Sequence, residues 1–166
     1  MVELITFRAP AASDAADLWR LARDSGSLDL NSPYAYLMWC TDFADTAVLA
    51  TDGDEVVGFV VGHRPPSDPD SAFVWQVAVA DDQRGRGLGR RLLLAFLDQP
   101  GNRDARWLTA TVTPSNTASL ALFRGAAAHL DVDCAERERF PASVFPAEAG
   151  DHEPEVALRI GPLPAD

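Results

Sequence analysis

The sequence predicts an α/β (α+β) fold in which one mixed central sheet is flanked by helices. Segments rich in β-branched and aromatic residues alternate with segments whose apolar residues recur at helical spacing. One junction is distinctive, because the apolar run 73–80 ends in a polar break and a glycine loop that opens directly into a helix. The length of 166 residues and the hydrophobic content of 47% fit one domain, residues 1–166, with a sizeable core.

The elements follow from local signals. Ser13 is the expected N-cap of the first helix, and Gly26 lies just beyond its end. Ser32 caps a second helix that has Pro33 at its first position, and the turn 52–54 joins a hairpin. In chain order we expect a strand at 4–8, a helix through 23, a helix from 33, strands at 46–51, 55–63 and 73–80, a helix through about 97, a strand at 107–112, a helix at 116–129, and strands at 132–137 and 156–160.

Composition excludes several classes of partner. The net charge is −11, and all 14 basic residues are Arg. An acidic surface argues against nucleic acid or an anionic membrane as a general partner. Cys40 and Cys134 are far apart in sequence, which favours a reducing compartment. With no secretory signal and no apolar run long enough to span a bilayer, we expect a cytoplasmic protein.

The glycine loop, Arg84-Gly-Arg-Gly-Leu-Gly89, points to a pyrophosphate ligand. Glycines let the main chain approach phosphates closely, and the N–H groups and dipole at a helix N-terminus favour negative charge. A P-loop would place Lys and then Ser or Thr after the last glycine, where this chain has Arg90 and Arg91. The spacing also differs from the Gly-x-Gly-x-x-Gly of dinucleotide folds. The alternative to phosphate binding is a solvated turn.

The loop and its flanking strand resemble the acyl-coenzyme A loop of the GNAT acetyltransferase superfamily, and the order of strands and helices is similar along nearly the whole chain. The resemblance implies the GNAT acyl-CoA N-acyltransferase fold, with acetyl-CoA as co-substrate. It also implies a sheet that splays beside the loop, so that the pantetheine arm binds like an extra strand. The residues expected to contact the coenzyme are Val77, Val79, Arg84, Gly85, Arg86, Gly87, Leu88, Gly89, Arg90, Asn116 and Phe123.

Two positions depart from the usual family pattern. In this family an Asn at the place of Asn116 touches the pantetheine arm, and a Tyr seven residues later protonates the departing thiolate, but this chain has Phe123 there. Strand 73–80 also lacks the carboxylate that many relatives use as a base. The general acid is therefore Tyr34, Tyr36 or a water molecule.

Four dispersed segments, 28–43, 73–79, 108–116 and 152–155, together resemble one branch of the superfamily, the L-2,4-diaminobutyrate acetyltransferases of ectoine biosynthesis. The resemblance implies transfer of acetyl to the 4-amino group of L-2,4-diaminobutyrate, which gives N4-acetyl-diaminobutyrate, the precursor of the compatible solute ectoine. A homodimer is a further expectation that rests on the resemblance alone.

This chemistry requires a base, because an alkyl ammonium has a pKa near ~10.4 and its deprotonation at neutral pH costs about 4 kcal/mol. We expect Glu155 to accept the proton, directly or through water, with His152 or Glu153 in support. Asp29 is expected to pair with the non-reacting ammonium. Further candidates for the substrate site are Tyr34, Asp42 and Trp75, with Tyr34 and Trp75 as aromatic walls around the amine.

Less specific interpretations remain for these residues. Trp75 fits core packing as well as substrate contact, Asp42 fits a solvated helix end, and Glu153 and Glu155 fit charges on a rim. Residues 152–155 do not form His-Glu-x-x-His, so we expect no metal. The alternative functions are acetylation of another amine (a polyamine, an aminoglycoside or a protein N-terminus) and a non-catalytic acyl-CoA-binding regulator.

Overall fold

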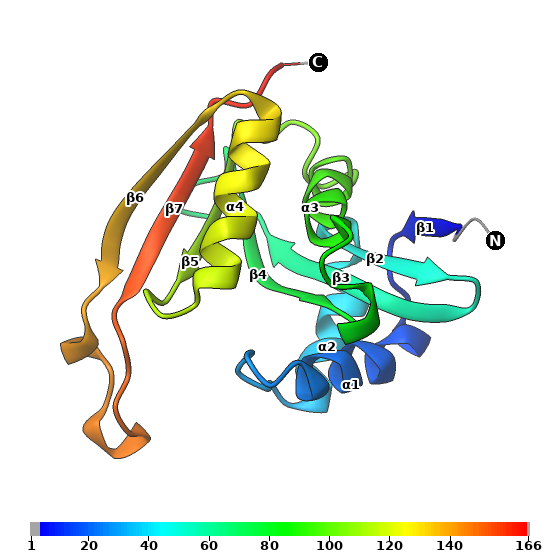
Figure 1. The fold of residues 1–166 in the computed structure, drawn as a ribbon, viewed down its shortest axis with the longest axis horizontal. Helices are drawn as coiled ribbons and strands as arrows, with labels where there is room; N and C mark the ends of the chain where they lie inside the picture. Colours follow the sequence, from blue (N-terminus) through cyan, green and yellow to red (C-terminus); the bar gives the residue numbers. More distant parts are fainter. Residues whose placement is uncertain (1–3, 166) are drawn as a thin grey trace.

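The computed structural model describes residues 4–165, and its core is one mixed sheet of seven strands with helices on both faces (Figure 1). The strand order is β1-β2-β3-β4-β5-β7-β6. The strands are β1 (Ile5–Arg8), β2 (Ala47–Asp52), β3 (Glu55–His63), β4 (Ser71–Val79), β5 (Trp107–Val112), β6 (Asp133–Phe140) and β7 (Glu155–Gly161). The helices are α1 (Ala15–Ser25), α2 (Pro33–Cys40), α3 (Leu88–Leu97) and α4 (Thr117–Leu130).

The two faces of the sheet carry separate cores. Helices α1 and α2 cover one face, where Tyr36, Leu49 and Phe59 are buried in one cluster. Helices α3 and α4 cover the other face, where Leu92 and Phe96 belong to a larger cluster. The predicted class, an α/β fold with a mixed sheet between helices, is therefore confirmed.

The sheet opens between β4 and β5. These two strands are parallel, and their pairing runs only from Ser71 opposite Trp107 to Val74 opposite Ala110. β4 then continues to Val79 along β3 alone, and Figure 1 shows the two strands diverging. The predicted splay of the sheet is present, and it leaves one edge of β4 without a neighbouring strand on the β5 side.

A β-bulge marks the point where β4 leaves β5. Val61 on β3 lies opposite Gln76 on β4, but the next residue of β3, Gly62, lies opposite Val74. Trp75 is therefore the extra residue on β4. Because of the bulge, the side chains of Val74 and Gln76 point to opposite faces of the sheet, although they are two residues apart. Val74 packs in the α3–α4 core, whereas Gln76 contacts Tyr36 beneath α2. The bulge also leaves Trp75 half exposed, so the core-packing interpretation of this residue is wrong.

Most helix ends agree with the sequence. Ser32 accepts a hydrogen bond from the Ala35 N–H, Asn116 caps α4, and Gly26 is left-handed at the end of α1. The prediction that Ser13 caps α1 is wrong. A 3-10 turn precedes the helix, and Asp14 takes the capping position, where its carboxylate bonds to Arg8 and to the Ala11 N–H.

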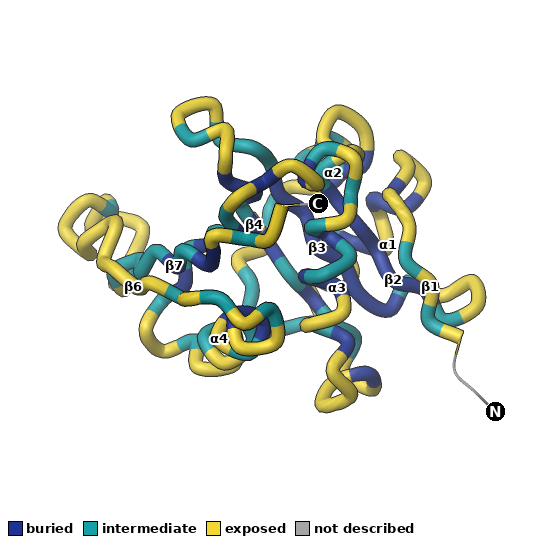
Figure 2. Tube along the Cα trace, turned by 90° about the horizontal axis from the view of Figure 1, so that it is seen from above, coloured by how far each residue is buried: buried dark blue, intermediate teal, exposed yellow. Residues whose placement is uncertain are grey.

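The last two strands are longer than expected and project from the body. β6 reaches Phe140, three residues beyond its predicted end, and β7 begins one residue early at Glu155. Between them, residues 141–154 form two short 3-10 turns at the far tip of this hairpin (Figure 1). Figure 2 shows that β6 is exposed along nearly its whole length. No helix within residues 4–165 is both long enough and apolar enough to cross a membrane.

Candidate active site

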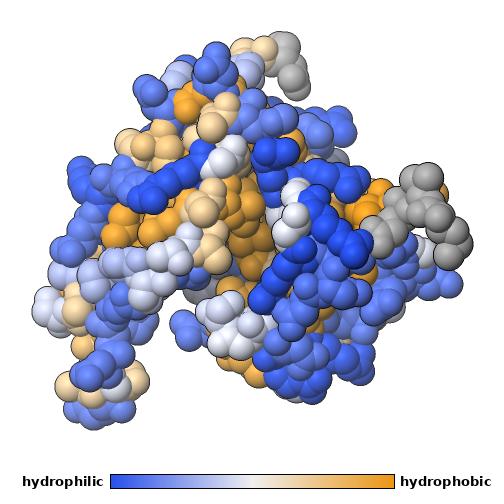
Figure 3. All heavy atoms as spheres, in the orientation of Figure 1, coloured by the Kyte–Doolittle hydropathy of each residue, from blue (hydrophilic) through white to orange (hydrophobic). Residues whose placement is uncertain are grey.

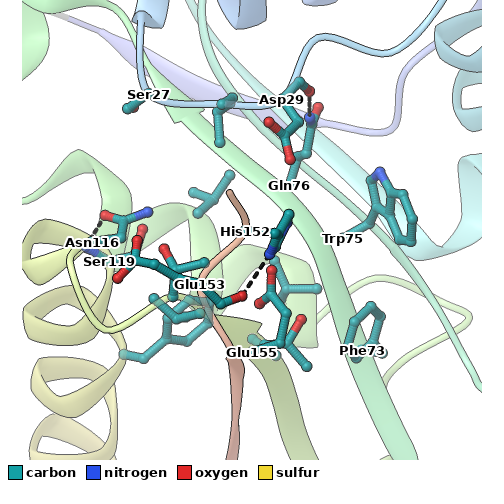
Figure 4. Close-up of a pocket in the computed structure, with 18 of the residues that line it drawn as sticks. Ser27, Asp29, Phe73, Trp75, Gln76, Asn116, Ser119, His152, Glu153 and Glu155 are labelled. Carbon is teal, nitrogen blue, oxygen red and sulfur yellow. Dashed lines mark hydrogen bonds between the residues drawn. The ribbon is translucent and has the colours of Figure 1, made fainter. Parts of the chain in front are cut away.

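The gap between β4 and β5 holds a cavity of about 490 Å³. Three segments that are distant in sequence meet there: the loop between α1 and α2, the middle of β4, and the end of the segment before β7 (Figure 4). The end of β5 and the start of α4 close the remaining side. The lining residues are Ser27, Leu28, Asp29, Asn31, Phe73, Val74, Trp75, Gln76, Val77, Ala110, Thr111, Val112, Thr113, Asn116, Ser119, Phe123, Asp151, His152, Glu153 and Glu155.

The cavity is strongly acidic. It is lined by four carboxylates, Asp29, Asp151, Glu153 and Glu155, and by His152. Asp29 lies on one side, and His152, Glu153 and Glu155 lie on the other (Figure 4). None of the described lining residues is an arginine. Several carboxylates that face one space attract an organic cation, and their field is strengthened where water is partly excluded.

The glycine loop lies at the opposite end of the exposed edge of β4 and has the opposite charge. Gly85 and Gly87 have φ values of 75° and 78°, and a Cβ atom at either would meet nothing within 4 Å. Both glycines are therefore required by backbone conformation, and the space beside them is open to a ligand. Gly87 is the N-cap of α3, so the free N–H groups of that helix face the loop.

The third glycine serves packing. A Cβ on Gly89 would lie 3.1 Å from the Leu122 side chain, so this glycine lets α3 approach α4. Leu88 is buried in the core, which leaves only its backbone to face a phosphate. Arg84 lies 3.1 Å from Asp81, and the side chains of Arg84, Arg86 and Arg90 are exposed. This end of the site is thus made of backbone groups from one continuous segment, with arginines around it.

A family model identifies the family in which this glycine loop and split sheet occur. The model of the acetyltransferase (GNAT) family matches residues 14–126, which include the loop, β4 and most of α4. The chain belongs to the GNAT acetyltransferase family. The GNAT fold and the use of acetyl-CoA that the loop suggested are therefore established.

Relatives of this GNAT chain match it from end to end. It is 46% identical over 160 residues to the L-2,4-diaminobutyric acid acetyltransferase of Shouchella clausii, covering 96% of this chain and 88% of that protein. The corresponding protein of Streptomyces coelicolor is 47% identical over 158 residues, covering 94% and 92%. A solved structure, the diaminobutyrate acetyltransferase EctA of Paenibacillus lautus with L-2,4-diaminobutyric acid and coenzyme A, is similar with a TM-score of 0.91 at 38% identity, covering 99% and 98%.

The GNAT fold brings most of the residues predicted for the amine and its chemistry to the cavity. Asp29, Trp75, His152, Glu153 and Glu155 all line it, although they come from three separate parts of the sequence. Among the residues predicted to contact the coenzyme, Val77, Asn116 and Phe123 line it too, while Val79 and the glycine loop follow further along the chain. Trp75 is 50% exposed, so its indole is available to a ligand.

Two predicted residues lie outside the lining. Tyr34 is in the first turn of α2 and is 68% exposed, three positions after the lining residue Asn31. Asp42 is an exposed residue just beyond the end of α2. The two tyrosines of α2 thus lie on different sides of the helix, since Tyr36 is fully buried.

Glu153 precedes β7, and Glu155 is at its start. The Glu153 carboxylate accepts hydrogen bonds from the N–H and the hydroxyl of Ser115, in the turn that precedes α4. His152 hydrogen-bonds the Glu153 carbonyl through Nδ1 and stacks on Phe145, with ring centroids 3.6 Å apart. Glu153 therefore links this segment to the turn that precedes α4. Glu155 is the first residue of β7 and is half-buried.

Asn116, which matches the usual GNAT pattern, and Phe123, which departs from it, both have structural roles as well. The Asn116 side chain accepts a hydrogen bond from the Ser119 N–H at 3.1 Å and so caps α4. Phe123 is 2% exposed and packs in the α3–α4 core, with one edge on the cavity. An apolar ring at this position donates no proton to a departing thiolate.

Neither thiol has the character of an acyl-carrying nucleophile. Burial raises the pKa of Cys40 to about 12, and burial also raises the pKa of Cys134. A thiol with a raised pKa is protonated and unreactive at neutral pH.

Sequence reasoning missed Gln76. Its side chain is nearly buried beneath the cavity, where it joins Tyr36 to the backbone of Asp29. The feature of the sequence that points to Gln76 is that its side chain is the single amide inside the apolar run 73–80. Sequence reasoning also missed the polar lining residues Ser27, Asn31 and Ser119.

Proposed function

We propose that this GNAT enzyme transfers the acetyl group of acetyl-CoA to the 4-amino group of L-2,4-diaminobutyrate. The observation that carries the proposal is the acidic cavity, with Asp29 on one side and Glu155 on the other. A diaminobutyrate ion has two ammonium groups, and each meets a carboxylate in this arrangement. The product is N4-acetyl-diaminobutyrate. We infer that it is the precursor of ectoine, because the sequence resembles the acetyltransferases of ectoine biosynthesis.

For acetyl-CoA, the pyrophosphate would lie on the glycine loop and the start of α3, with Arg84, Arg86 and Arg90 around it. The pantetheine arm would follow the free edge of β4 past Val77 and Val79, because that edge has backbone groups and no strand opposite. Figure 3 shows apolar atoms along the centre of this face, between α4 and the chain around α3. The thioester supplied by the coenzyme would then lie at the cavity.

For the amine, we assign Asp29 to the α-ammonium and Trp75 to one wall of the site, where the indole face adds a cation–π contact. Glu153 supports the site from its fixed position on Ser115. Tyr34 and Asp42 remain candidates at the rim, where they would reach the substrate only from outside the cavity lining.

Glu155 is the proposed base, directly or through one water, with His152 beside it as a relay. It takes a proton from the 4-ammonium, and the freed nitrogen lone pair attacks the thioester carbonyl carbon. The resulting oxyanion accepts a hydrogen bond from the Val79 N–H. The C–S bond then breaks to leave a thiolate, and the attacking nitrogen loses its second proton to water as the amide forms. The thiolate is protonated by Tyr34 or by water, since the Tyr36 hydroxyl is buried and already donates to Gln76.

Thiol release from acetyl-CoA tests this function. We expect fast release with L-2,4-diaminobutyrate, much slower release with ornithine, lysine and spermidine, and an amide at the 4-nitrogen by NMR. Preferred turnover of a polyamine, an aminoglycoside or a peptide would replace the proposed substrate. Tight binding of acetyl-CoA without turnover of any amine would favour the regulator.

We further propose that the enzyme acts as a homodimer in the cytoplasm. The face of β5, β7 and β6 opposite α4 has a groove of about 460 Å³, lined in part by Ala135, Arg137 and Arg139. Phe140 and Val144 expose apolar side chains at the end of the same hairpin. An exposed strand with apolar residues is a favourable surface for a second copy. The free thiols of Cys40 and Cys134 and the use of acetyl-CoA support a cytoplasmic location.

Light scattering on the purified protein tests the dimer. We expect a mass near twice that of the 17.9 kDa chain, which a double substitution of Phe140 and Val144 by Asp lowers to that of the monomer. A monomeric wild type would contradict the proposal.

A further inference from the structure

The loop that carries Asp29 is weakly packed. Residues 26–32 join α1 to α2, and of these only Leu28 and Asn31 are even half-buried. The Leu28 N–H donates to Ser25 Oγ at a long 3.4 Å, whereas the Asp29 carbonyl accepts a 2.7 Å bond from Gln76. The shorter of these two bonds therefore comes from the sheet, at the residue proposed to bind the substrate.

Gln76 reaches this loop because of the bulge at Trp75. If residues 74–76 formed a regular strand with no bulge, Gln76 would share a face with Val74 and point into the α3–α4 core. The bulge instead turns Gln76 toward α2, where it is 6% exposed. The same irregularity thus exposes Trp75 in the cavity and places an amide beneath Asp29.

The chemistry of its partners fixes the orientation of the amide. A backbone carbonyl only accepts, so the group that faces Asp29 is Nε2, and Oε1 faces Tyr36. The Tyr36 hydroxyl must then donate, at 2.9 Å. Burial raises the pKa of Tyr36, with contacts to Asn31 and Gln76 offsetting part of the rise, so the phenol keeps its proton. Both hydrogen bonds therefore have a fixed direction. The Tyr36 hydroxyl donates to the Gln76 amide oxygen, and the Gln76 amide N–H donates to the Asp29 carbonyl.

We propose that Gln76 is a positioning residue, which holds the Asp29 backbone so that its carboxylate faces the α-ammonium of the amine substrate. The role rests on the proposed function, because it assigns Asp29 to that ammonium. Figure 4 shows the bond from Gln76 to the Asp29 backbone, with the Asp29 carboxylate on the cavity side. An amide is suited to this role since it satisfies a buried carbonyl and a buried hydroxyl without adding charge to a cavity that already has four carboxylates.

The test is Gln76→Leu, which keeps the size of the side chain and removes both bonds. We expect the KM for L-2,4-diaminobutyrate to rise ~10-fold, while kcat and the KM for acetyl-CoA stay within ~2-fold, because only the Asp29 carboxylate is displaced. Tyr36→Phe keeps the bond from Gln76 to Asp29 and removes only the contacts of the Tyr36 hydroxyl with Gln76 and Asn31, so this KM should rise less than in Gln76→Leu, by less than ~3-fold. Gln99→Leu is the matched control, since Gln99 Nε2 also bonds a backbone carbonyl, that of Ala95, away from the cavity.

Hydrogen exchange of the free enzyme gives a second measurement that needs no substrate. In Gln76→Leu the amides of residues 27–31 should exchange ~10-fold faster, with α1 and α2 unchanged. Unchanged exchange, or equal loss of affinity for both substrates, would overturn the positioning role. If the wild type does not acetylate diaminobutyrate, the proposed function fails, yet the exchange result still decides whether Gln76 holds the loop.

Discussion

The two ends of the β4 edge are built in opposite ways. The coenzyme end is one continuous segment, 84–91, in which backbone N–H groups, left-handed glycines and arginines surround the start of α3. The amine end is assembled from side chains of three segments, 27–31, 73–77 and 151–155, and it is acidic. One end suits a polyanion, and the other suits a small molecule that carries two ammonium groups.

The difference indicates which parts of such an enzyme change with its substrate. A pyrophosphate and a pantetheine arm are the same for every acetyl-CoA enzyme, so backbone groups suffice to bind them. The acceptor differs between enzymes, and it is read by side chains such as Asp29 and Glu155 that separate segments contribute. A substitution at one end should therefore leave the KM of the other substrate nearly unchanged.

The largest effect is expected at the reacting nitrogen. Glu155→Gln should lower kcat ~100-fold or more at neutral pH, because the base is lost, with little change in the KM for acetyl-CoA. Steady-state rates of thiol release measure both. Glu148→Gln is the control, since Glu148 is exposed in the tip of the hairpin and lies outside the cavity lining. Equal activity of the two variants would remove Glu155 from the chemistry.

Gly87→Val perturbs the coenzyme end alone. A β-branched residue at a φ of 78° strains the loop, so the KM for acetyl-CoA should rise ~30-fold while the KM for the amine stays within ~3-fold. Gly125→Ala is the matched control, because Gly125 has no positive φ and a Cβ there meets nothing within 4 Å. An amine KM that rises as much as the acetyl-CoA KM would mean that the two ends are not separate.

Asp29→Asn perturbs the amine end. Loss of the charged partner of the α-ammonium should raise the KM for L-2,4-diaminobutyrate ~10-fold, with acetyl-CoA binding unchanged in calorimetry. Asp54→Asn, in the exposed hairpin turn between β2 and β3, should match the wild type. A weaker acetyl-CoA affinity in Asp29→Asn would contradict the assignment.

The contrast between the ends also explains what the sequence could predict. The glycine loop, Ser32 and Asn116 act within a few residues of themselves, so local patterns identify them. Asp29, Trp75 and Glu155 were proposed from a resemblance, since nothing local says that they meet. Gln76 was missed because a bulge at Trp75 reverses the strand's alternation, and Ser13 was misassigned because Arg8, from β1, holds Asp14 at the cap.

The smallest effect is expected away from both ends. Asp14 is 7% exposed and bonds to Arg8 and the Ala11 N–H, so Asp14→Asn should lower the free energy of unfolding by about 1 kcal/mol at pH 7 and leave both KM values unchanged. The Arg8 hydrogen bonds are the main cause that lowers the pKa of Asp14 below its ordinary 3.8. The stabilisation by the ionised Asp14 carboxylate is therefore complete above pH 3.8, and it is lost as the pH falls through the lowered pKa of Asp14.

In urea melts, the stabilities of wild type and Asp14→Asn should accordingly converge once the pH has fallen below the lowered pKa of Asp14. A difference that persists there, or that grows as the pH falls, would contradict this account of the pair.

The most direct test of the central claim compares two substrates that differ by one ammonium group. 4-Aminobutyrate lacks only the α-amino group of L-2,4-diaminobutyrate, and Asp29 is the residue assigned to that group. We expect the wild type to prefer diaminobutyrate ~100-fold in kcat/KM, and Asp29→Asn to reduce this preference to within ~10-fold. A preference that is equally large in Asp29→Asn would contradict the account.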